Sequence, residues 1–348
     1  MNLIGLNILI GLLGSGSNTI IENEKISFKN YTDLDEKAEQ MGFDTNKTKL
    51  KKINDLSDKK YIVGEQVKSA YFIYSIELDN VIEYSLKSPS PYLEYDDKML
   101  YAGPGKYLID EDNVYYSLLE NVYYEKSNVN KVSAISNYKY EIDSNKISTM
   151  NSTVIDSYLI KHPEFFIDDC KENCGYFGGG YCGFIGLGLL VGYQDKYHND
   201  NIMDDKYYHD PLTKTGLKNG DDSISKLLYD SNPKDSTTSK HIKTVLKDYA
   251  KSKEVSVDYI SRWTPFFSFN DILKQIKNDN PVELFGTFSY ENSSNSKTES
   301  TGAHALVAYE FDVLNLDSWQ IKCHLGWKNY NEVIISGYVI GSIFSFSC

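Results

Sequence analysis

The chain has 348 residues, which is too long for one small hydrophobic core and favours two domains of ordinary size. Its hydrophobic content of 41% is sufficient for a globular protein. The net charge of −13, without a basic patch to neutralise phosphates, argues against nucleic acid as the main partner.

The first residues form an apolar run from Leu3 to Leu13, which ends in a Gly-Ser-Gly-Ser segment. Its length suits the apolar core of a secretory signal and is too short for a membrane span. We therefore predict a signal peptide over residues 1–17 and a secreted or cell-surface protein; the alternative is a buried or disordered tail. No other stretch is long enough to cross a bilayer, so no stable membrane insertion is expected.

Residues 20–150 are predicted to form a separate, strand-rich N-terminal domain. The part before residue 60 is polar with weak helical periodicity, and short strands then follow up to about Glu125. The clearest strands are 70–76 and 80–85, and a Gly-Pro-Gly turn lies between further strands at 101–107. The Ser-, Asn- and Lys-rich stretch 126–155 is predicted to be a linker or exposed surface.

Residues 156–348 show helices first and strands later, which is typical of an α+β domain. Apolar spacing predicts a buried helix that begins near Cys182, a second helix around 242–249 and a third over 269–278. Ser268 and Asp271 give the third helix a capping-box start. After Pro281 we expect a strand over 282–289, a polar loop over 291–301, strands that carry His304 and His324, and a final strand pair over 333–346.

Cys182 is the strongest candidate for a nucleophile. It lies between the run Gly178–Gly180 and the apolar segment from Phe184, at the predicted first turn of a helix. Unpaired N–H groups at a helix start favour a negative charge, so we expect a lowered thiol pKa. The alternative is a buried structural cysteine.

Two histidines follow in apolar, strand-like surroundings. His304 is the candidate general base that would take the proton of Cys182 and return it to the leaving group. His324 is the candidate for the third residue, which orients His304, and Trp327 would shield their hydrogen bond from water. The alternative for His304 is a satisfied core histidine.

The five cysteines fit one unpaired thiol and up to two disulfides in an oxidising compartment. Cys170 could pair with Cys174, and Cys323 with Cys348; in a reducing compartment all five would remain thiols. No second cysteine pair at ligand spacing accompanies Cys170 and Cys174, so no metal site is expected, and no cofactor either.

Three segments of the chain resemble the sequence blocks of papain-like cysteine peptidases, and most closely the bacterial streptopain, staphopain and C39-like members. These are Tyr181-Cys182-Gly183-Phe184, Gly302-Ala303-His304-Ala305-Leu306-Val307 and His324-Leu325-Gly326-Trp327. The resemblance covers roughly 160–348. It implies a central helix that bears the cysteine, packed on a twisted antiparallel sheet, and hydrolysis of peptide bonds in proteins or peptides. The strands at 71–84 resemble the streptopain propeptide or its related inhibitor domain, which implies that residues 20–150 are a propeptide or accessory domain.

The chain departs from the family at two positions. His324 stands where the family has Asn or Asp, and no Gln precedes Cys182 to stabilise the oxyanion. Asn173, Tyr176 and Tyr181 are the replacement candidates for that donor, together with the Cys182 backbone N–H. Two other functions stay open. One is a cell-wall amidase of the NlpC/P60 type, in which a third-position histidine is normal, and the other is an inactive papain-like binding module.

Overall fold

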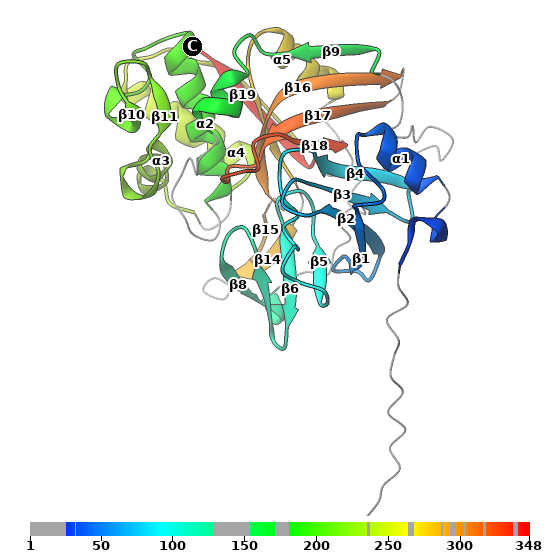
Figure 1. Ribbon diagram of the computed structural model, residues 1–348. Helices are drawn as coiled ribbons and strands as arrows, with labels where there is room; N and C mark the ends of the chain where they lie inside the picture. Colours follow the sequence, from blue (N-terminus) through cyan, green and yellow to red (C-terminus); the bar gives the residue numbers. More distant parts are fainter. Residues whose placement is uncertain are drawn as a thin grey trace, which may run out of the picture.

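The protein was analysed as a computed structural model (Figure 1). It describes residues 26–31, 33–128, 154–170, 181–234, 237–263, 268–286, 288–292, 297–301, 304–315, 318–336 and 340–348. Within these residues the fold is a sheet-rich mixture of helices and strands, as the α+β prediction requires. The predicted signal peptide lies outside the described residues. No helix in the described part of the chain is long and apolar enough to cross a membrane.

The described part of the N-terminal half contains helix α1 packed on a series of strands, which pair antiparallel except for the parallel pair β1–β5. Its elements are α1 (Leu34–Gln40), β1 (Lys49–Asn54), β2 (Lys60–Gln66), β3 (Ala70–Ser75), β4 (Asn80–Ser85), β5 (Met99–Tyr101), β6 (Tyr107–Glu111), β7 (Val114–Ser117) and β8 (Val122–Glu125). The strands predicted at 70–76 and 80–85 are confirmed as β3 and β4. Helix α1 covers one face of this sheet, where Leu34 and Ala38 pack in a cluster with Phe72 and Tyr84.

The C-terminal half contains the longer helices and the remaining strands. Its elements are β9 (Asp156–Leu159), a π-helix (Phe165–Asp169), α2 (Cys182–Tyr197), β10 (Tyr208–Asp210), β11 (Thr215–Leu217), α3 (Ile224–Ser231), α4 (Ser239–Ser252), β12 (Asp258–Trp263), α5 (Phe269–Lys277), β13 (Val282–Phe285), β14 (Phe288–Asn292), β15 (Lys297–Thr301), β16 (Ala305–Asn315), β17 (Ser318–His324), β18 (Val333–Ser336) and β19 (Ser342–Ser347). Helices α2, α3 and α4 lie together on one side of the molecule (Figure 1).

The three predicted helices are confirmed, and each begins as the sequence indicates. Thr238 caps α4, because its hydroxyl accepts a hydrogen bond from the His241 backbone N–H. Ser268 and Asp271 form the predicted capping box at α5. Helix α3 was not predicted, although Ser223 caps it in the usual way.

Two strand predictions are wrong. The segment expected as a polar loop after residue 290 instead forms the hairpin β14–β15, which pairs Phe288 with Thr301. The last two strands do not pair with each other: β18 lies beside β17, and β19 lies between β12 and β13. The segment of β14 and β15 was predicted as a loop because its residues are mostly polar. The neighbours of β18 and β19 could not be predicted because these strands pair with segments that are distant in the chain.

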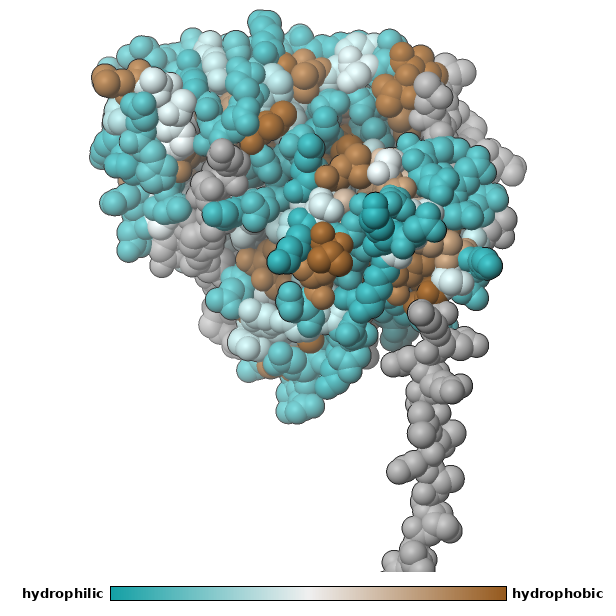
Figure 2. Space-filling model, viewed as in Figure 1, coloured by the Kyte–Doolittle hydropathy of each residue, from teal (hydrophilic) through white to brown (hydrophobic). Residues whose placement is uncertain are grey.

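The two halves share one sheet. Its strand order is β12-β19-β13-β16-β17-β18-β4-β3-β2-β1-β5-β6-β7-β8, with β9 paired to β16. The halves meet where β18 pairs antiparallel with β4, at Ile334–Tyr84 and Ile335–Glu83 (Figure 1). One hydrophobic cluster also includes buried residues from both halves, among them Tyr107 and Tyr309. The visible outer face is mostly hydrophilic, since most large apolar side chains are in this core (Figure 2).

Candidate active site

Helix α2 carries Cys182 at its N-terminal end. Cys182 is its first residue and is half-buried, whereas the following residues up to Asp195 are buried. Gly183 and Gly186 let the helix approach its neighbours closely. A Cβ at Gly183 would lie 2.1 Å from the Thr237 hydroxyl, and one at Gly186 would lie 2.4 Å from a Glu283 oxygen. The glycines that weaken this helix intrinsically are therefore explained by its packing.

His304 stands immediately before β16 and is only 1% exposed. Its Nε2 lies 2.6 Å from the Leu325 backbone carbonyl, which can only accept, so Nε2 carries the proton. The other nitrogen, Nδ1, is then an acceptor, and it has no hydrogen-bond partner among the described residues. The Trp327 ring lies against the imidazole, with ring centroids 4.1 Å apart, and covers it from one side.

Cys182, His304 and Glu120 form one cluster. One donor atom of each residue, namely the Cys182 sulfur, one His304 ring nitrogen and one Glu120 carboxylate oxygen, lies within 4.8 Å of the other two. The structure therefore places the predicted nucleophile and the predicted base side by side, although they are far apart in sequence. Glu120 comes from the turn between β7 and β8 in the N-terminal half, and no local motif in the sequence indicated it.

A buried ion pair from the N-terminal half borders this cluster. Lys106 Nζ lies 2.5 Å from Glu120 Oε2, and the two side chains are 3% and 2% exposed. Ser117 and Tyr124 also donate their hydroxyls to Oε2, at 2.8 and 2.7 Å. Among the described residues these three hydrogen bonds all go to Oε2, and the buried charge is neutralised by the ammonium group beside it.

The β5–β6 turn packs directly against the His304 ring. Gly105 adopts φ +75°, and a Cβ there would lie 2.1 Å from His304 Cδ2. Only glycine combines this backbone conformation with such a close approach. The turn was predicted from its Gly-Pro-Gly sequence, but its position over the candidate base could not be predicted from sequence alone.

The environment of the cluster favours neutral forms of both candidate catalytic groups. Burial, with a further contribution from the Glu120 charge, raises the pKa of the Cys182 thiol to about 11. Burial lowers the pKa of His304 to about 3, although Glu120 acts in the opposite direction. The expected lowering of the thiol pKa by the helix start is thus wrong for the intact chain, because desolvation and a nearby carboxylate outweigh a partial charge of about +0.5 at the helix terminus.

His324 does not orient His304. Its Nδ1 accepts a hydrogen bond from the Gly326 backbone N–H at 2.8 Å, and its Nε2 donates to the Cys170 carbonyl at 2.7 Å. Both ring nitrogens are therefore used by the backbone. The predicted hydrogen bond from His304 to the His324 ring is wrong, and the Leu325 carbonyl takes that place.

The candidates for the oxyanion donor are only partly described. Asn173 and Tyr176 lie outside the described residues, as does Cys174. Tyr181 precedes α2, and its ring packs against Tyr229 with centroids 4.2 Å apart. Cys323 and Cys348 are not joined to each other; each is a thiol.

Glu283 is a buried carboxyl group beneath α2. It is 0% exposed, and neither of its oxygens has a hydrogen-bond partner among the described residues. Burial raises its pKa well above the ordinary value and so favours the neutral, protonated form. Any charge that Glu283 carries acts to raise the pKa of the Cys182 thiol, as a smaller contribution than burial and Glu120.

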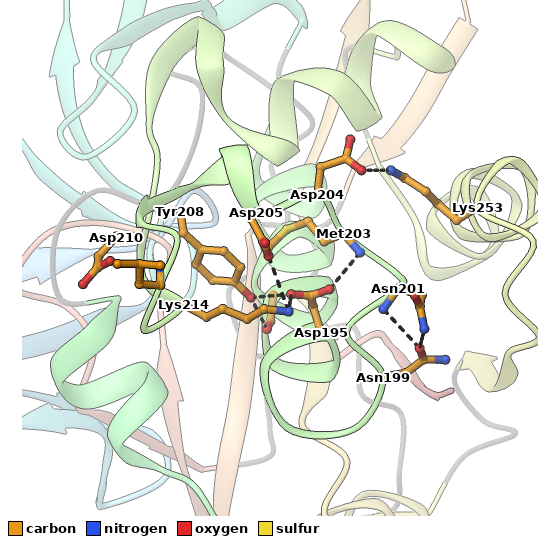
Figure 3. A network of polar contacts seen from close by, with 12 residues as sticks. Asp195, Asn199, Asn201, Met203, Asp204, Asp205, Tyr208, Asp210, Lys214 and Lys253 are labelled. Atoms are coloured by element: carbon orange, nitrogen blue, oxygen red, sulfur yellow. Dashed lines mark hydrogen bonds and ion pairs between the residues drawn. The ribbon is translucent and has the colours of Figure 1, made fainter.

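A second polar cluster lies at the other end of α2 (Figure 3). Asp195 accepts hydrogen bonds from the Met203 backbone N–H at 2.9 Å and from the Tyr208 hydroxyl at 3.0 Å. Lys214 Nζ, at 2.8 Å, neutralises this carboxylate. Its partners fix the β10–β11 hairpin to the helix, so we assign this cluster a structural role.

Comparisons with known proteins add little to the site. No family model matches the chain, and no curated protein matches it. One solved structure, described as a "putative C39-like peptidase" from Bacillus anthracis, is similar over 56% of this chain and 98% of its own length. The sequence identity is 12% and the TM-score is 0.33, so this likeness carries no argument about function.

Proposed function

We propose that the chain is a secreted cysteine peptidase in a latent form, with Cys182 as nucleophile and His304 as general base. The observation that carries the proposal is the position of His304. Its Nε2–H is held by the Leu325 carbonyl, Nδ1 is left as an acceptor, and the ring belongs to the cluster that contains the Cys182 sulfur. A base fixed in this tautomer can take the thiol proton and return it to the leaving amine.

The reaction follows from this arrangement. The Cys182 thiol gives its proton to His304 Nδ1, and the sulfur attacks the carbonyl carbon of the scissile peptide bond. His304 then protonates the departing amine, which leaves an acyl-enzyme that water hydrolyses with His304 again as base. The Leu325 carbonyl accepts from His304 Nε2–H throughout, and Trp327 shields this hydrogen bond from water.

Latency is supported by the contacts that the N-terminal half makes with the pair. Gly105 lies against the His304 ring, and Glu120, which is paired with Lys106, contributes an oxygen within 4.8 Å of both groups. In this proposal these residues take the place of a substrate beside Cys182 and His304. The pKa values of about 11 and about 3 also keep the pair neutral in the intact chain. Residues 20–150 thus act in this proposal as an inhibitory propeptide.

The competing functions have less support. The amidase alternative depended on His324 as an orienting residue, but both nitrogens of His324 bond to the backbone. An inactive binding module remains an outcome of the test below, since a covered site is compatible with it.

The test measures labelling of Cys182 and hydrolysis of denatured protein, before and after limited proteolysis within 129–153. We expect labelling and hydrolysis to increase after cleavage and dissociation of the N-terminal half, and Cys182→Ala to abolish both. Cys348→Ala is the matched control, because Cys348 is also a half-buried thiol. Hydrolysis retained in the Cys182→Ala variant would exclude the peptidase mechanism, and absence of labelling in the processed chain would favour the binding module.

A further inference from the structure

The cluster around Cys182 has the composition of a zinc site. A thiolate, an imidazole nitrogen and a carboxylate oxygen form a donor set typical of Zn²⁺, whereas Mg²⁺ and Ca²⁺ prefer oxygen ligands alone. The three candidate donor atoms, from Cys182, His304 and Glu120, lie within 4.8 Å of one another. Zinc–ligand bonds of about 2.0–2.3 Å in a tetrahedron place donors about 3–4 Å apart, so shifts on the order of 1 Å close the site.

Two donor groups are already oriented by their neighbours. His304 donates its Nε2–H to the Leu325 carbonyl, as metal-bound histidines usually do with their second nitrogen. Glu120 holds its Oε2 against Lys106, Ser117 and Tyr124, and these bonds leave Oε1 for another contact.

An independent observation also points to a ligand. His304 Nδ1 is an acceptor in a side chain that is 1% exposed, and it has no hydrogen-bond partner among the described residues. Leaving a buried acceptor unpaired costs about 1–3 kcal/mol, and a metal ion would remove this cost.

We propose that the intact chain binds one Zn²⁺ through Cys182 Sγ, His304 Nδ1 and Glu120 Oε1, with water as the fourth ligand. Binding releases one proton, because the Cys182 thiol must become a thiolate. Two ligands come from the C-terminal half and one from the N-terminal half. The metal would therefore connect the halves and block the nucleophile. The proposal goes beyond the peptidase function and does not require peptidase activity.

The test uses the full chain with Zn²⁺ in calorimetry and with Co²⁺ as a spectroscopic probe. We expect one metal ion per chain, release of one proton, a thiolate-to-Co²⁺ charge-transfer band and protection of Cys182 from alkylation by Zn²⁺. Cys182→Ser should remove the band.

The double variant Lys106→Met/Glu120→Gln removes a ligand and its counter-charge together, so that no unpaired buried charge remains. It should weaken Zn²⁺ binding by about tenfold or more. The control is Lys51→Met/Glu65→Gln, which removes another buried Lys–Glu pair of the N-terminal half, with side chains 4% and 2% exposed. Thermal unfolding checks that both variants are folded.

Equal Zn²⁺ affinity in the two double variants, or Co²⁺ bound without the thiolate band, would overturn the proposal. Failure of the peptidase proposal is seen separately, as absence of hydrolysis by the metal-free, processed chain. Each proposal can therefore fail without the other.

Discussion

At the residue scale, His324 connects two backbone segments that are distant in sequence. Its ring joins the Gly326 N–H to the Cys170 carbonyl, 154 positions away, and it is 0% exposed. Burial lowers its pKa to about 4, so it stays neutral near pH 7. This arrangement makes His324 a structural residue beside the candidate active site.

We expect His324→Ala to destabilise the fold by roughly 2–4 kcal/mol, because two buried backbone groups lose their partner. Urea unfolding of the full chain measures this, with His209→Ala, at an exposed histidine, as the control. An unchanged unfolding midpoint together with a shifted acid limb of the pH–activity profile would instead restore the orienting role.

The sequence indicated part of the candidate site. Cys182 could be predicted because it lies between a glycine run and an apolar segment with helical character. His304 and Trp327 could be predicted because their segments resemble the sequence blocks of papain-like cysteine peptidases. The role of His324 was mistaken because residue type alone does not show whether its nitrogens already bond to the backbone. Lys106 and Glu120 had no local signal, since their importance arises from contacts across the two halves.

At the element scale, the β5–β6 turn combines a left-handed glycine with direct contact to the candidate base. The contact depends on the missing Cβ of Gly105. An added methyl group at Gly105 would therefore disturb the contact between this turn and His304.

Gly105→Ala should displace the turn from His304 and increase the rate at which Cys182 is alkylated in the intact chain. The control is Gly220→Ala, which has a similar φ of +66° but open space around its Cβ position. Both variants carry a backbone strain of about 1 kcal/mol, so their difference isolates the contact with His304. Equal alkylation rates would show that the turn does not limit access.

Periodicity predicted the elements that bury one clear face. Helices α4 and α5 have regular apolar spacing and side-chain caps, and strands β3 and β4 have strong β-formers. The hairpin β14–β15 was not predicted, because its second strand consists of polar residues, Lys297–Thr301. The order of the strands in the sheet could not be predicted from the sequence, because pairs such as β4–β18 join segments about 250 positions apart in the chain.

At the scale of the whole molecule, the Lys106–Glu120 pair makes the stability of the full chain depend on pH. Burial alone would raise the pKa of Glu120, but Lys106 and the Tyr124 hydroxyl outweigh it and hold the pKa below its usual value. A carboxyl group with a lowered folded-state pKa stabilises the fold above its unfolded pKa, and this stabilisation is lost as the pH falls through the folded value.

We therefore expect the full chain to lose stability below about pH 4.3, the ordinary range of Glu, more steeply than Lys106→Met/Glu120→Gln does. Urea midpoints measured from pH 6 to pH 3 test this. Glu83, whose pKa is raised mainly by burial, acts in the opposite sense and is present in both proteins, so it cancels in the comparison. Parallel pH profiles of the two proteins would contradict the expectation.

The pairing of β4 with β18 has a consequence for any processed form. While the halves stay together, β18 has a neighbour on each side, β17 and β4. Loss of the N-terminal half would leave a row of unpaired N–H and C=O groups along Val333–Ser336, next to apolar side chains such as Ile334 that β4 had covered. Such an edge is a template for another extended chain. Loss of the N-terminal half would thus turn β18 from an internal strand into an exposed edge strand. Such an edge strand could pair with a peptide segment or with a second processed molecule.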